Sequence, residues 1–114
     1  MWDGKKKAVT FSYDDGVEQD RRLAELFNAY GVKATFNLNS GIQTRAFSFV
    51  EGKSGIVVRR MNQQGLRGVY SGHEIASHGL THANPVECDE ETLYNEVQAD
   101  KQNLEALFEQ EIVG

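Results

Sequence analysis

The stretch that decides the fold is Lys-Ala-Val-Thr-Phe-Ser-Tyr-Asp-Asp-Gly, residues 7–16. Residues 7–13 are rich in β-branched and aromatic side chains, which predicts a strand, and Gly16 ends it in a turn. Apolar residues then recur at helical spacing from Glu18 to Tyr30, with Gly31 as the stop. A second strand is predicted at residues 32–38. Such a β-α-β unit favours a parallel sheet.

The segment after the second strand is less regular. Residues 39–55 are rich in turn formers, and we expect a long loop that carries Phe47 and Phe49. Residues 56–70 are ambiguous, because Val57-Val58 hints at a strand while later apolar positions fit a helix. We expect the second half of this segment to be helical.

The last third of the chain predicts a strand, a long helix and the start of another strand. Residues 73–77 are predicted to form a short third strand, and Asp89 is a good N-cap for a helix that ends near Glu109. An apolar stripe marks one face of that helix. Residues 111–114 are expected to open a fourth strand. The order of elements predicts one α/β domain of parallel strands joined by crossover helices.

Composition excludes several classes of protein. The chain has 114 residues, of which 39% are hydrophobic, and this supports one small domain with a real core. A net charge of −5 argues against a nucleic-acid surface. No apolar run approaches the ~20 residues that a membrane span needs, and the N-terminus lacks the apolar region of a signal peptide. We therefore expect no membrane span and, for the chain as written, a cytoplasmic location by default. Cys88 is alone, so no internal disulfide can form.

The residues with chemical potential stand at two predicted strand ends. Asp14 and Asp15 follow the first strand, and His78 and His82 follow the third. Functional groups in a parallel α/β array collect past the carboxyl ends of the strands, so we expect these four residues to share one rim. If residues 78–82 take a helical turn, both imidazoles can reach one ion.

One carboxylate and two imidazoles form a ligand set for a divalent metal with open positions. Asp15 would complete that set, while Asp14 would stay free to take a proton. Asp-Asp-Gly is also a common turn, and two histidines at this spacing also occur on helix surfaces. The two motifs at matching strand ends together favour a metal site. We expect His73 to be structural, while Asn37 and Asn39 could contact a polar substrate or shape turns.

These motifs resemble a known family. Residues 10–16 resemble the first motif of the polysaccharide deacetylases with the NodB homology domain, carbohydrate esterase family 4. Residues 72–82 resemble the second, metal-binding motif of that family, and Ala34-Thr35-Phe36 matches its second strand. The resemblance implies a partial, distorted (β/α) barrel. It implies that Asp14 is the general base, and that Asp15, His78 and His82 hold the metal, usually zinc.

The same resemblance implies a substrate and a wider context. The expected reaction removes acetyl groups from N-acetylated or O-acetylated sugars or polysaccharides, and the family often acts outside the cytoplasm. Gly79 stands where the family often has Ser or Thr, which we expect to loosen the loop of the histidines. The later motifs, including an Arg-containing one and one that supplies the general acid, are absent. Residues 1–114 are therefore expected to be the N-terminal part of the domain.

Two other functions remain open at this point. One is a degenerate, non-catalytic module of the same fold that binds metal and carbohydrate. The other is a Mg²⁺ phosphohydrolase with paired aspartates, although two histidines suit zinc better. Part of a barrel leaves a sheet edge uncovered, and we expect the apolar stripe of the long helix to need a partner surface. Association with further copies of the chain, or marginal stability, is therefore also predicted. The stripe consists of Leu93, Val97, Leu104 and Phe108.

Overall fold

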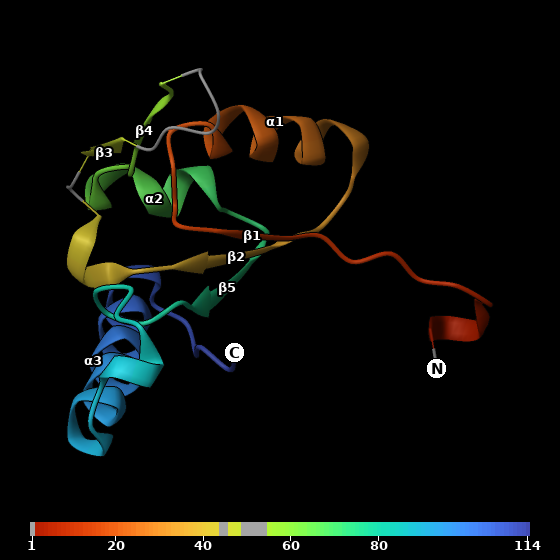
Figure 1. Ribbon diagram of the computed structural model, residues 1–114. Helices are drawn as coiled ribbons and strands as arrows, with labels where there is room; N and C mark the ends of the chain where they lie inside the picture. The colour runs from red at the N-terminus through yellow and green to blue at the C-terminus, as the bar shows by residue number, and fades with distance from the viewer. Residues whose placement is uncertain (1, 44–45, 49–54) are drawn as a thin grey trace.

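The computed structural model describes residues 2–43, 46–48 and 55–114. Its centre is a three-stranded parallel sheet in the order β1-β2-β5 (Figure 1). The strands are β1 (Ser12–Asp14), β2 (Thr35–Leu38) and β5 (Glu74–Ser77). The register places Tyr13 beside Phe36 and Phe36 beside Ile75. The parallel sheet that the β-α-β pattern predicted is therefore present.

Three α-helices flank the sheet. In Figure 1, α1 (Asp20–Tyr30) and α2 (Gln63–Val69) lie together on one side of the strands, and α3 (Glu90–Phe108) lies on the other. The predicted helix boundaries are close to these, and Asp89 caps α3 by accepting a hydrogen bond from the amide of Thr92 at 2.8 Å. Single turns of 3-10 helix complete the helical structure at η1 (Trp2–Gly4), η2 (Ser40–Ile42) and η3 (Pro85–Glu87).

The predicted loop at residues 39–55 needs correction. It contains η2 and a short strand, β3 (Ala46–Ser48), which pairs antiparallel with β4 (Val57–Arg59). A strand of three residues is too short to display an alternating pattern, so only the valines of β4 gave a signal. Phe47 lies in β3, whereas Phe49 lies outside the described residues.

Three predicted strands also differ from the structure by more than one residue. Strand β2 begins at Thr35 rather than at residue 32. Strand β1 is shorter than the predicted residues 7–13, because regular pairing with β2 begins only at Ser12. Residues 111–114 form no regular strand. One backbone hydrogen bond links the amide of Ser77 to the carbonyl of Gly114 at 2.9 Å, and Ile112 is buried.

The hydrophobic core lies between the sheet and the helices. Phe36 and Leu38 of the central strand are fully buried, and Met61, Leu66 and Leu104 pack with them. Burial of each such side chain contributes about 1.5–3 kcal/mol. Leu104 and Phe108 thus find their partners within this chain, contrary to the expectation for the apolar stripe. Leu93 and Val97 of the same stripe stay exposed.

No helix among the described residues is long and apolar enough to cross a membrane.

Candidate metal centre

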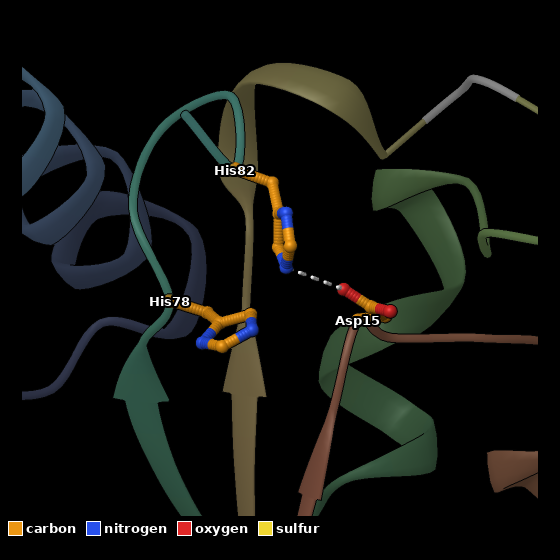
Figure 2. A group of neighbouring side chains, drawn as sticks. All are labelled: Asp15, His78 and His82. Carbon is orange, nitrogen blue, oxygen red and sulfur yellow. Dashed lines mark ion pairs between the residues drawn. The ribbon is translucent and has the colours of Figure 1, made fainter. Parts of the chain in front are cut away.

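Three side chains converge at the carboxyl edge of the sheet. Asp15 directly follows β1, His78 directly follows β5, and His82 lies on the loop beyond it. Each offers a ligand atom, and these atoms lie within 4.8 Å of one another. Figure 2 shows the three side chains directed toward one another. Asp15 and His78 are half-buried while His82 is exposed, so the group opens toward solvent on the His82 side.

The turn after β1 separates the two aspartates. The backbone takes positive φ angles of 77° at Asp15 and 60° at Gly16, and the amide of Asp15 donates to the carbonyl of Asn37 at 3.0 Å. Asp14 remains exposed on β1, outside the group of three. Its Oδ1 accepts a hydrogen bond from Nδ2 of Asn37 at 2.8 Å. The two neighbouring carboxylates therefore have different surroundings.

The histidine loop is not the helical turn that the spacing suggested. Its backbone takes left-handed conformations at Gly79 (φ 82°) and His82 (φ 60°), and the two imidazole centroids lie 4.9 Å apart at a steep angle. In a helix, the carbonyl of His78 would accept the amide of His82. Instead, Nδ2 of Asn39 donates to the carbonyls of His78 and Gly79 at 2.6 and 2.8 Å. The rings meet because the loop folds back over Asn39.

Asn39 and His73, two further polar residues noted in the sequence, are buried and stabilise the fold. Asn39 is fully buried and holds the histidine loop. His73 is buried, and its Nδ1 accepts a hydrogen bond from the amide of Ala34 at 3.3 Å. Its ring packs edge-on against Phe36, with centroids 5.3 Å apart. Burial, assisted by the positive charge of Lys33, lowers the pKa of His73, so the imidazole is held neutral.

Arg60 is a site residue that the sequence did not reveal. Its guanidinium donates to Oδ1 of Asp15 at 2.8 Å, and only 8% of the Arg60 side chain is exposed. The same Asp15 oxygen lies 3.8 Å from Nε2 of His82. Arg60 therefore orients the Asp15 carboxylate and balances part of its charge. It directly follows β4, and no local pattern links it to a residue 45 positions earlier.

Comparisons with known proteins agree with this architecture. Residues 2–114 match the family model for polysaccharide deacetylase, and the chain belongs to that family. Among curated proteins, none matches the chain significantly.

Solved structures of similar fold include several family 4 esterases. The deacetylase PplD of Streptococcus pyogenes, solved in complex with acetate, is 17% identical with a TM-score of 0.76; 96% of this chain covers 45% of that one. A family 4 carbohydrate esterase from Bacillus anthracis is 18% identical with a TM-score of 0.69; 91% of this chain covers 44% of that one. A mutant pseudoenzyme of family 4 with restored enzymatic activity is 20% identical with a TM-score of 0.71. The match covers 95% of this chain and 35% of that one.

These likenesses establish the fold as a partial, distorted (β/α) barrel of the NodB type, as predicted. The chain spans less than half the length of the solved structures described above.

Proposed function

We propose that the protein containing this chain is a metal-dependent deacetylase of N-acetylated or O-acetylated sugars or polysaccharides. The observation that carries the proposal is the convergence of Asp15, His78 and His82, whose ligand atoms lie within 4.8 Å of one another. Membership of the polysaccharide deacetylase family supplies the substrate class.

The three side chains fit a divalent ion. One carboxylate oxygen and two imidazole nitrogens are ligands that zinc prefers, and three protein ligands leave a position open for chemistry. Two imidazoles suit zinc better than magnesium, so we favour the deacetylase over the Mg²⁺ phosphohydrolase. A zinc ion held by these residues would act as a Lewis acid and lower the pKa of water.

Asp14 is assigned the role of general base. The hydrogen bond from Asn37 fixes the position of Oδ1 of Asp14. Among the described residues, the other oxygen of Asp14 has no hydrogen-bond partner, so it is available to accept a proton. Asp14 would take that proton from the water that attacks the acetyl carbonyl. Asn37 therefore acts on the base rather than on the substrate.

We also propose that residues 1–114 form the N-terminal part of a NodB domain. Support comes from the lengths of the matched structures, of which this chain covers 35–45%. Under this proposal the general acid and part of the substrate groove come from outside these residues.

Metal removal and substitutions in the full-length protein distinguish the proposed roles of Asp14 and the metal ligands. Acetate release from chitin oligomers should stop on treatment with a chelator and return with Zn²⁺. Asp14→Asn should retain the metal and lower kcat by about 10²–10⁴-fold, because only the proton acceptor is lost. His82→Ala should lose the metal. If Asp14→Asn released zinc as readily as His82→Ala, Asp14 would be a ligand.

The alternative is a non-catalytic module of the same fold. It is favoured by one observation, that a family 4 pseudoenzyme shares this fold. Such a module would bind zinc through the same three side chains but release no acetate, and Asp14→Asn would change nothing measurable. Metal content and acetate release, measured on the same samples, therefore distinguish the two functions.

A further inference from the structure

Two buried carboxylates of α3 face the loop that carries the histidines. Glu96 and Asp100 are four residues apart on the helix, and 8% and 0% of their surfaces are exposed. Neither forms an ion pair with any residue that the structure describes. Buried acidic side chains are rare unless they are paired, because burial of the charge is costly. Here hydrogen bonds take the place of ion pairs.

Glu96 holds the segment directly before His82. Its Oε2 accepts a hydrogen bond from the amide of Thr81, and its Oε1 accepts one from the Thr81 hydroxyl, both at 2.8 Å. Its backbone carbonyl accepts the amide of Leu80 at 3.0 Å. Burial would raise the pKa of Glu96, but hydrogen bonds from Thr81 and from the backbone of Ala83 and Leu80 together outweigh it, and the pKa is lowered. Glu96 is thus an ionised acceptor, and hydrogen bonds to ionised groups are the stronger kind.

Asp100 holds the segment directly before His78. Its Oδ2 accepts a hydrogen bond from the hydroxyl of Ser77 at 2.6 Å. Its Oδ1 accepts one from the amide of Ser40, also at 2.6 Å, which ties the end of β2 to the same helix. Each histidine is therefore preceded by a residue that is fixed to α3.

Gly79 lets the loop approach the helix. A Cβ atom at Gly79 would lie 3.3 Å from Oε2 of Glu96, and the positive φ of 82° disfavours other residues there. That Gly79 loosens the loop stays a prediction, although hydrogen bonds with Glu96 and Asn39 tie the loop to its surroundings.

We propose that Glu96 and Asp100 are positioning residues that set the affinity of His78 and His82 for the metal. This inference rests on the proposed metal site. The reason is geometric: His82 is exposed and the loop has no regular structure, so the neighbours of the histidines must fix where the rings lie. Partners beyond the ligands orient metal sites in this way.

The test is a metal titration of the 114-residue chain and its variants. Co²⁺ serves as the probe, because its visible absorption reports both binding and ligand geometry, and Zn²⁺ competition gives the affinity. Glu96→Ala should weaken binding by about 10–100-fold and change the Co²⁺ spectrum. Glu96→Gln should restore most of the affinity, because an amide can still accept the Thr81 amide and donate to its hydroxyl. Thr81→Val, which leaves α3 intact, should weaken binding by about fivefold.

Glu105→Ala is the matched control. Glu105 lies on the same helix and accepts a hydrogen bond from the amide of Ile112 at 3.3 Å, and neither this bond nor its ion pair with Lys101 involves the histidine loop. This variant can lose stability without losing metal. Circular dichroism at the titration temperature confirms that each variant is folded.

The outcomes separate the two proposals. If the wild type binds one ion, His82→Ala does not, and folded Glu96→Ala and Thr81→Val bind like the wild type, the positioning role is wrong while the metal site stands. Should Glu96→Ala fail to fold, unchanged affinity in Thr81→Val overturns the role by itself. Failure of the wild type to bind an ion better than His82→Ala overturns both proposals.

Discussion

The three histidines of the chain differ in their burial, which bears on the metal site that we propose. His78 is half-buried and His82 is exposed, whereas His73 is buried against the rings of Phe27 and Phe36 and accepts a backbone amide through Nδ1. A proton on Nδ1 would remove that hydrogen bond. His73 therefore stabilises the fold only in its neutral form.

A pH dependence of stability follows from the lowered pKa of His73. A group whose folded pKa lies below its unfolded value, about 6.5, contributes stability that is fully present above that value. The contribution is lost as the pH falls through the folded pKa, because the unfolded chain binds the proton more readily. The free energy of unfolding should therefore decrease below about pH 6.5.

His73→Asn provides the comparison, because its Oδ1 can take the place of Nδ1 as an acceptor. Urea unfolding of both proteins between pH 5 and 8, with chelator present, measures the difference. The variant should show a shallower decline in acid. Parallel curves for the two proteins would mean that His73 does not titrate on unfolding.

Among the secondary-structure elements, α1 offers a clean test of helix termination. Gly31 ends the helix with φ at 66°, and its amide donates to the carbonyl of Asn28 at 3.2 Å. A Cβ atom there would meet nothing within 4 Å, so only the backbone conformation opposes a side chain. Gly31→Ala should destabilise the protein by about 1–2 kcal/mol.

Gly68→Ala is the matched substitution inside α2. A Cβ atom there also has open space, but the backbone is helical, so alanine should stabilise the protein by about 0.5–1 kcal/mol. Thermal unfolding of both variants measures whether each substitution lowers or raises the stability. A loss of stability in both would show that the space around Gly68 is needed.

The elements also show where sequence patterns carry information. Helices α1 and α3 are long enough for an apolar face to repeat, so their existence and their ends could be predicted within a few residues. The β3–β4 hairpin could not, since each strand has three residues. The convergence of Asp15 with the histidines followed from the parallel order of β1 and β5.

The path of the chain between the elements was not predictable in the same way. Arg60 reaches Asp15 only because the segment after the hairpin returns to the first turn, where the amide of Met61 donates to the carbonyl of Gly16. Glu96 and Asp100 lie on a helix whose apolar stripe was evident, but nothing local indicates that acidic side chains beside it are buried. Contacts of this kind depend on tertiary structure.

The domain exposes a strand edge and an apolar helix face through which it could associate with other chains. Strand β1 lies at one edge of the sheet, and apolar side chains along α3, including Leu93, Tyr94 and Val97, are exposed. Open strand edges and apolar patches pair with other chains. We therefore expect the 114-residue chain to associate with copies of itself or to be marginally stable.

The same chain should bind zinc but release no useful amount of acetate from chitin oligomers, since under our proposal the general acid lies elsewhere. Sedimentation and acetate release, compared with the full-length protein, measure both expectations. A stable monomer that turns over as fast as the full-length protein would contradict them.

The left-handed backbone at His82 implies that, under our proposal, the metal site costs folding stability. At φ 60° a residue with a Cβ atom is disfavoured, and the side chain of His82 is 54% exposed, so it contributes little packing in return. His82→Gly should therefore raise the free energy of unfolding of the metal-free chain by about 1 kcal/mol, while abolishing ion binding. Urea unfolding with and without Zn²⁺ measures both effects. In a lineage that no longer needed the ion, drift at this position would favour glycine, and a domain without the ion would fold better than its active ancestor.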